Sequence, residues 1–282
     1  MSLEAIVFPE GAPRPGQLVE IVGPTNIGKS LLLLELATNL VLPVTCGGNE
    51  RKVLLLDCEN TFDLSVILAL MEKCILNNAI PSLARTLDAQ QIERIQQESL
   101  ERLYLYQCYS QKLCEWCWWH LDETTFPEYR DIEVVLVDSI ATFYLPNPTR
   151  EHPRHIEKYI RKRCKFLRRK AKKFQKSVIY TKTPYSVSPT DSPVLDPECS
   201  PTMEERLTGK LLAKRKRRRH PLRSIPVRYR IELSLANPPP SAEDDEDVDR
   251  QFNAIITTRK KRQYERHYLI DDFGFNWIEQ QE

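Results

Sequence analysis

Apolar runs and helix-periodic segments alternate along residues 18–181. The run 53–57 is apolar up to its last residue, which is typical of a parallel strand covered by helices on both faces. Segment 154–175 instead places its apolar residues three and four apart, which predicts a helix packed along one face. This alternation predicts an α/β fold with a mainly parallel, twisted sheet flanked by helices. Strands are expected at 18–22, 53–57, 103–106, 133–138 and 177–181, and helices at 31–42, 62–77, 88–103, 110–121 and 154–175.

The pattern changes in the C-terminal part of the chain. Residues 184–224 are rich in proline, serine and charge, and we expect them to form a mobile basic loop. Residues 236–250 combine three consecutive prolines with an acidic run, which predicts a disordered insert. Between these segments, 227–235 alternates as a strand. Residues 252–258 and 264–270 then predict an antiparallel hairpin that closes the fold.

With 282 residues, the chain can bury a full core. We expect residues 1–16, which contain three prolines, to be an extended lead-in with no helical domain before the sheet, and 17–282 to form a single domain. Segment 31–42 is too short and too polar to cross a bilayer, so no membrane association is expected. Eight cysteines without framework spacing, and no signal-peptide pattern, predict reduced thiols in a nuclear or cytosolic compartment.

The first strand-to-helix junction carries a phosphate-binding motif. The chain fits G-x-x-x-x-G-K-[ST] at every fixed position, between an expected strand and an expected helix. Such a loop wraps backbone N–H groups around a phosphate at a helix N-terminus, where the helix dipole favours an anion. Lys29 is expected to reach the β- and γ-phosphates of a nucleotide, and the Ser30 hydroxyl to bind Mg²⁺. This phosphate loop consists of Gly23, Pro24, Thr25, Asn26, Ile27, Gly28, Lys29 and Ser30.

Nucleotide hydrolysis at such a loop also needs a metal-binding acid and a base that orients water. Asp138 ends the apolar run 133–138 and is the candidate Mg²⁺ acid; the alternative is that it caps the following turn. Asp57 and Glu59 flank Cys58 at another strand end, where alternation places both acids on the same side. From these residues alone, a base and an ordinary strand-end cap are equally compatible with the pattern.

Together, the phosphate loop and the segments 56–62 and 136–141 resemble the core of the RecA-type strand-exchange recombinases. The resemblance implies a RecA-like P-loop ATPase core that binds ATP and Mg²⁺. It also implies that Glu59 is the catalytic base that activates water and that Asp138 assists the Mg²⁺ ion.

The resemblance covers about residues 16–183 and, more weakly, 251–278. Finer features are similar to one branch of the eukaryotic paralogues, a short form without the N-terminal helical domain. These features are the end of the first helix at 41–43, the sequence at 138–144 and the hairpin with 267–270.

Two positions depart from the family pattern. The family has a Gln that senses the γ-phosphate just after the fifth expected strand. In this chain the corresponding position is near Thr183, between Lys182 and Pro184, and no Gln is present there. Ile27 is bulky where the family has small residues before the second glycine of the loop. These departures affect nucleotide-driven strand exchange and hydrolysis more than ATP binding. The sequence is therefore compatible with a DNA-dependent ATPase and with a protein that binds ATP without efficient hydrolysis.

Basic and acidic residues are segregated, although the net charge is only +2. Segment 158–176 holds eleven Lys and Arg residues and no acid, which suits a solvated helix face, a phosphate contact or an acidic partner such as the run 243–247. The second basic run, 214–219, is favoured as a nuclear-import signal, with a DNA-backbone contact as the alternative.

The stretch 114–120 contains two cysteines, three tryptophans and a histidine. A zinc site read from this stretch would need a second cysteine pair at ligand spacing along the sequence, and the sequence contains no such pair. We therefore interpret the stretch as a helix that contributes aromatic residues to the core or to a partner-contacting surface.

The first functional hypothesis is a nuclear recombinase paralogue that works with other paralogues in a hetero-oligomer during homologous-recombination repair. It would bind single-stranded or branched DNA and assist the strand-exchange filament. The alternatives are a P-loop kinase or other phosphotransferase of a small molecule, and a scaffold subunit that does not hydrolyse ATP. The basic residues lie on a helix face and in a loop, which suits a polyanion better than a small substrate.

Overall fold

The computed structural model describes residues 3–85, 87–144, 153–184, 226–236, 251–271 and 274–278. The basic run 214–219 and the acidic run 243–247 lie outside the described residues, and so does almost all of the expected loop 184–224 and insert 236–250. Within the described ranges, the helices are too short or too polar to span a membrane.

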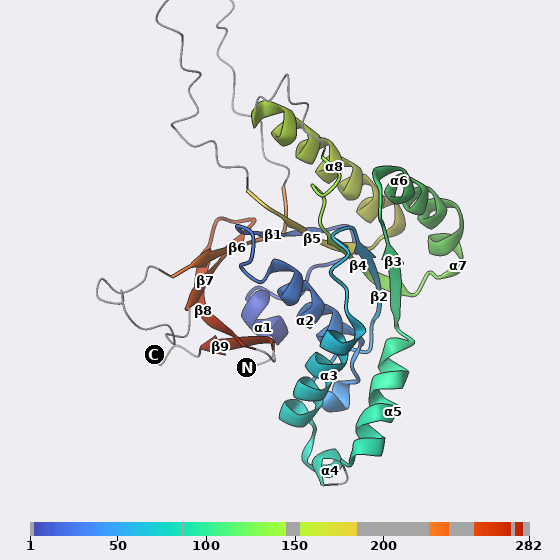
Figure 1. The fold of residues 1–282 in the computed structure, drawn as a ribbon, viewed down its shortest axis with the longest axis vertical. Helices are drawn as coiled ribbons and strands as arrows, with labels where there is room; N and C mark the ends of the chain where they lie inside the picture. Colours follow the sequence, from blue (N-terminus) through green and yellow to red (C-terminus); the bar gives the residue numbers. More distant parts are fainter. Residues whose placement is uncertain are drawn as a thin grey trace, which may run out of the picture.

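A nine-stranded sheet with the order β3-β2-β4-β5-β1-β6-β7-β8-β9 forms the centre of the molecule (Figure 1). Neighbours from β3 to β6 pair in parallel, and β6 to β9 pair antiparallel. This agrees with the predicted α/β class and its antiparallel C-terminal extension. The strands are β1 Leu18–Val22, β2 Lys52–Asp57, β3 Leu103–Gln107, β4 Ile132–Asp138, β5 Ser177–Lys182, β6 Tyr229–Leu235, β7 Phe252–Thr258, β8 Gln263–Asp271 and β9 Gly274–Ile278.

Helices cover both faces of the parallel half, with α2, α3 and α5 on one face and α6 and α8 on the other (Figure 1). Alternate strand residues therefore enter two separate cores: Val53 and Leu55 face α2, whereas Leu54 and Leu56 face α6 and α8. The helices are α1 Leu3–Val7, α2 Lys29–Val41, α3 Leu64–Asn78, α4 Pro81–Ala84, α5 Ala89–Leu100, α6 Gln111–His120, α7 Phe126–Glu128 and α8 Pro153–Phe174, with a 3₁₀ turn at Val44–Cys46 and a π-helical turn at Leu121–Thr125.

Side chains cap the N-termini of predicted helices. Asp88 accepts a hydrogen bond from the Gln91 N–H at 2.7 Å at the start of α5, and Ser110 accepts one from the Leu113 N–H at 3.2 Å at the start of α6. These two residues are the first positions of the helices predicted at 88–103 and 110–121, which the structure places at Ala89–Leu100 and Gln111–His120.

The structure differs from the expectations at the two ends of the chain. Residues Leu3–Val7 form α1 instead of an extended lead-in, because Ile6, Val7 and Phe8 are buried. At the other end, Gly274–Ile278 forms a further strand, β9, that the sequence pattern did not predict. Both short elements gain their stability from packing on α2 and β8, which propensity alone does not report.

Glu35 of α2 is the polar link between this helix and β9. Its Oε1 accepts a hydrogen bond from the Phe275 N–H at 2.5 Å. Burial raises the pKa of Glu35 to about 7, and the hydrogen bond and the nearby Lys73 oppose that rise. The carboxyl therefore keeps its proton in the folded chain at a pH where an exposed glutamate has lost it.

We expect Glu35→Gln to remove a pH-dependent loss of stability. As pH rises from about 4.5 to about 7, the unfolded chain releases the Glu35 proton before the folded chain does, so the free energy of unfolding falls. The stability of Glu35→Gln relative to wild type should therefore rise by about 2–3 kcal/mol between pH 5 and pH 8. Urea unfolding at both pH values measures this, with Glu72→Gln on the exposed side of α3 as the control. An equal difference at both pH values would contradict the assignment.

Candidate nucleotide-binding site

The phosphate loop connects β1 to α2, as predicted. Gly28 precedes the first residue of α2 with φ +85°, and Asn26 also has positive φ at +59°. No side chain caps the N-terminus of α2, and its first turn contains no acidic residue. The first N–H groups and the positive end of the helix dipole therefore remain available to an anion.

The C-terminal strands β8 and β9 pack against the phosphate loop. The Tyr268 hydroxyl donates a hydrogen bond to the Ile27 carbonyl at 3.1 Å. A Cβ atom on Gly28 would lie 2.7 Å from Ile270 Cδ1 and 2.8 Å from Phe275 Cζ. Glycine is thus required at this position by close packing as well as by backbone conformation. Ile27 itself is 5% exposed and packs into the core on the α2 face. This burial accounts for a bulky side chain at a position where the resembling family has small residues.

Lys29 lies among the acids that the sequence assigned to the site. Its Nζ donates to the Pro24 carbonyl within the loop. Burial lowers the pKa of Lys29, while the negative charges of Asp138 and Glu59 oppose that shift. One cation and two carboxylates from three separate segments therefore meet at the phosphate loop.

Asp138 lies at the carboxyl end of β4 and is 5% exposed. Its carboxylate accepts hydrogen bonds from the hydroxyls of Thr181 and, at 3.4 Å, Thr61. Burial raises the pKa of Asp138, and the Ser30 and Thr181 hydroxyls lower it in part. The two predicted Mg²⁺ ligands, Ser30 and Asp138, therefore lie close enough for the Ser30 hydroxyl to act on the Asp138 carboxylate.

The structure separates the roles of Asp57 and Glu59. The Asp57 carboxylate accepts hydrogen bonds from the N–H groups of Thr61 at 3.3 Å and Phe62 at 3.1 Å, so it caps the turn before α3. Glu59 is exposed, and its Oε1 accepts a hydrogen bond from the Thr142 hydroxyl at 2.6 Å. Only Glu59 of this pair therefore presents a carboxylate toward the open side of the phosphate loop. Thr142 was missed because no motif marks a hydroxyl in a loop.

Thr183 follows β5 and is exposed. Just before it, Lys182 forms an ion pair with Glu20 of β1 at 2.6 Å. Glu20 is 3% exposed and also contacts Arg230 at 2.7 Å and the Tyr180 hydroxyl at 3.0 Å. The sequence signal for this buried network is a single acid within the otherwise apolar strand 18–22.

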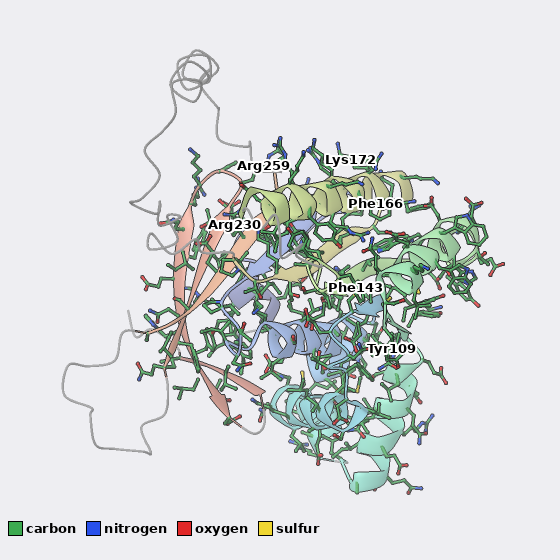
Figure 2. The ribbon with its side chains drawn as sticks, turned by 45° about the horizontal axis from the view of Figure 1, so that its top comes forward. Tyr109, Phe143, Phe166, Lys172, Arg230 and Arg259 are labelled. Carbon is green, nitrogen blue, oxygen red and sulfur yellow. The ribbon has the colours of Figure 1, made fainter. Side chains whose placement is uncertain are left out.

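Helix α8 presents a cationic outer face, as its sequence predicted. Figure 2 shows Lys172 among the side chains along the outer edge of this helix. Other residues of the basic segment have different roles: Lys170 and Lys173 both contact Asp122, and Lys176 is buried with its Nζ donating to the Arg130 carbonyl at 2.6 Å. The exposed cations of α8 are Lys158, Lys162, Lys165, Arg169, Lys172 and Lys173.

Comparison with known proteins gives the site a family context. No family model matches the chain. The chain is 41% identical over 76 residues to the DNA repair protein RAD51 of Mycosarcoma maydis, covering 27% of this chain and 22% of that protein. It is 26% identical over 135 residues to the DNA repair protein XRCC2 of Mus musculus, covering 48% of this chain and 44% of that protein.

The chain is homologous over part of its length to RAD51 and XRCC2, which is consistent with a RecA-type paralogue. Its similarity to both proteins, together with the parallel sheet flanked by helices, confirms the predicted RecA-like core and the resemblance to a paralogue of the XRCC2 type. The matches span less than half the length of these relatives, at 22% and 44%. The roles of the individual site residues in this chain stay predictions.

Proposed function

We propose that this RecA-type homologue is an ATP-binding recombinase paralogue that supports homologous-recombination repair in the nucleus as a subunit of a paralogue complex. The observation that carries the proposal is the meeting of Lys29, Ser30, Glu59 and Asp138 at one end of the parallel sheet. The similarity to two DNA repair proteins supports the repair context.

The residues at the phosphate loop fit a nucleotide with its Mg²⁺ ion. The uncapped N-terminus of α2 offers N–H donors to phosphate oxygens, and Lys29 adds a positive charge beside them. The Ser30 hydroxyl and the Asp138 carboxylate are oxygen donors of the kind that Mg²⁺ prefers. When bound, the metal ion would neutralise phosphate charge, and Asp138 would hold it directly or through water.

Glu59 is the residue of this site that can act on water. Its carboxylate is held by the Thr142 hydroxyl and lies close enough to influence the pKa of Lys29 and of Asp138. In this role Glu59 would orient a water molecule toward the γ-phosphate and accept its proton. Thr183 lacks the amide that the family's sensor provides, and we therefore propose slow turnover relative to ATP binding.

ATP turnover measured with and without single-stranded DNA tests the proposed function. DNA-stimulated turnover that is lost in Glu59→Gln supports a recombinase-like ATPase. Tight ATP binding without turnover, together with co-purification of another paralogue, supports an assembly subunit. The exposed Trp116 and Trp119 on α6 are 55% and 59% exposed and offer a surface for such a partner. Phosphate transfer to a small molecule would instead support the phosphotransferase alternative and contradict our proposal.

We expect neutralising the outer face of α8 to weaken DNA binding. Lys162, Lys165 and Lys172 are exposed on α8, three and seven residues apart, so each can contact a backbone phosphate. The triple change to Gln should lower affinity for single-stranded DNA and reduce the slope of log K against log salt by about one for each lost phosphate contact. Fluorescence anisotropy at several salt concentrations measures both quantities.

Arg94→Gln is the matched control for this experiment, because Arg94 lies on α5, on the other side of the sheet (Figure 1). This control should leave both the affinity and the salt dependence unchanged. An unchanged salt slope in the triple variant would remove α8 from the DNA-binding surface.

A further inference from the structure

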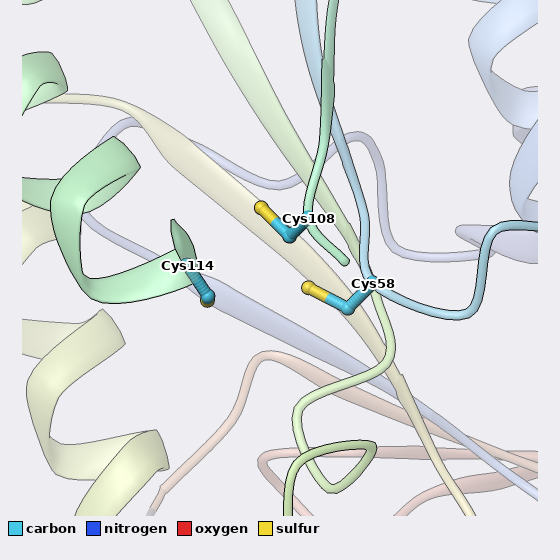
Figure 3. A group of neighbouring side chains, drawn as sticks. All are labelled: Cys58, Cys108 and Cys114. Carbon is cyan, nitrogen blue, oxygen red and sulfur yellow. The ribbon is translucent and has the colours of Figure 1, made fainter. Parts of the chain in front are cut away.

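Three cysteines from different parts of the chain meet beneath α6, outside the phosphate loop. Cys58 follows β2, Cys108 follows β3, and Cys114 lies in the first turn of α6 (Figure 3). Their sulfur atoms all lie within 4.8 Å of one another. The three residues are 2%, 0% and 6% exposed, respectively, and none forms a disulfide. We refer to Cys58, Cys108 and Cys114 as the thiol cluster.

Regular structure fixes the position of each member of the thiol cluster. Strands β2 and β3 are parallel neighbours whose last residues, Asp57 and Gln107, are paired. The Cys108 N–H continues this pairing with a hydrogen bond to the Asp57 carbonyl at 2.8 Å. Ser110 then caps α6, so that the first turn of the helix returns over the two strand ends. The thiols therefore converge because of the fold and not through a flexible loop.

A small cavity lies beside the thiol cluster. The Cys58 and Cys108 sulfurs both lie within 4.8 Å of the Cys114 sulfur. A cavity of about 20 Å³ borders Cys58 and Cys114, which is room for one water molecule or a small ion. A disulfide would join two of the three sulfurs and leave the third thiol buried beside it.

We propose that Cys58, Cys108 and Cys114 form a structural thiolate site for a soft divalent cation, with Zn²⁺ as the ion that fits best. Zn²⁺ in structural sites takes tetrahedral sulfur and nitrogen ligands and is shielded from solvent. The three thiolates would supply three of the four ligands, and the adjoining cavity has room for a water molecule as the fourth. The Arg163 side chain acts on Cys114 with a positive charge, which offsets the negative charge of a zinc–thiolate centre.

Such a site would connect two strand ends to the helix that covers them. Cys58 precedes Glu59 directly, and both of their N–H groups donate to the Asp138 carbonyl, at 2.5 and 3.1 Å. Zinc binding would therefore hold the turn that carries Glu59 without touching the nucleotide. This inference is independent of ATP binding, because the thiols lie on the opposite face of β2 from the phosphate loop.

Metal analysis of the full chain tests this proposal. We expect the protein, purified under reducing conditions with zinc in the medium, to contain about one zinc ion per chain by elemental analysis, as for a single site. Cobalt added to the metal-free protein should give the strong sulfur-to-cobalt absorption of a tetrahedral thiolate site. Cys58→Ser, Cys108→Ser and Cys114→Ser should each lose most of the bound zinc.

Cys46→Ser is the matched control, because Cys46 is equally buried but belongs to the core on the α2 face. It should keep the full zinc content. If a cluster variant fails to fold, the wild-type protein still decides the question: a thiol-modifying mercurial should release zinc, and a chelator should lower the thermal midpoint. Wild-type protein with no stoichiometric zinc and no cobalt–thiolate absorption would overturn the proposal.

Discussion

Lys29→Ala should weaken ATP binding by about 10- to 150-fold, because charge-assisted hydrogen bonds contribute about 1.5–3 kcal/mol each. Lys29 supplies the positive charge at the phosphate loop, and the charges of Asp138 and Glu59 act on it directly. The same lysine bears an unfavourable burial cost, which lowers its pKa. Its removal should therefore impair binding while leaving the fold intact. Titration with a fluorescent ATP analogue in the presence of Mg²⁺ measures the affinity, and circular dichroism reports the fold.

Lys112→Ala is the control for this variant, since Lys112 is an exposed lysine at the start of α6. We expect wild-type affinity from it. If Lys29→Ala and Lys112→Ala bind ATP equally well, the phosphate loop is not the nucleotide site. Asp138→Asn provides a second test. It should weaken ATP binding in the presence of Mg²⁺ more than it weakens binding in the absence of the metal.

Tyr268→Ala should lower the free energy of unfolding by about 3–5 kcal/mol, as is usual for truncating a fully buried aromatic residue. Tyr268 is 0% exposed, and its ring stacks on Phe275 at 4.5 Å and Phe252 at 5.2 Å between centroids. Its hydroxyl also bonds the Ile27 carbonyl in the phosphate loop. The lost free energy of unfolding therefore comes from the contact between the C-terminal strands and the phosphate loop.

Tyr268→Phe separates the two contributions of this residue. It keeps the aromatic packing and removes only the hydrogen bond, so we expect a loss of about 1 kcal/mol. Urea unfolding measures both variants. Tyr109→Phe serves as the control, because Tyr109 is 66% exposed and should change stability by less than about 0.5 kcal/mol. A Tyr268→Ala variant as stable as this control would show that the strands do not support the loop.

The parallel half of the fold could be predicted from the sequence because its signals are local. Continuous apolar runs predicted β2 and β4, and the helices predicted from 88 and 110 are capped in the structure by those residues, Asp88 and Ser110. Strand β9 lacked such a signal, since a glycine and an asparagine interrupt its apolar residues. Its partner β8 stabilises it by pairing, and pairing between strands is not encoded within the strand itself.

The candidate site could likewise be predicted only in part from the sequence. The motif identified the phosphate loop, and strand-end acids identified Asp138, because these residue types are required by their chemistry. Sequence alone left Asp57 and Glu59 equivalent, and the structure distinguished them through the N–H groups that Asp57 caps. In the same way, the basic segment of α8 predicted a cationic face, but only packing showed that Lys176 is buried.

The sequence by itself determined which elements form and which chemical groups they carry: a phosphate loop, strand-end carboxylates, scattered thiols and a basic helix. The tertiary structure alone decided which of these groups meet. Strand β2 lies between β3 and β4, so Asp57 pairs with both Gln107 and Asp138, while Cys58 reaches Cys108 on the other face. The physical reason is that backbone preferences act over a few residues, whereas parallel crossovers bring together strand ends that are far apart along the chain.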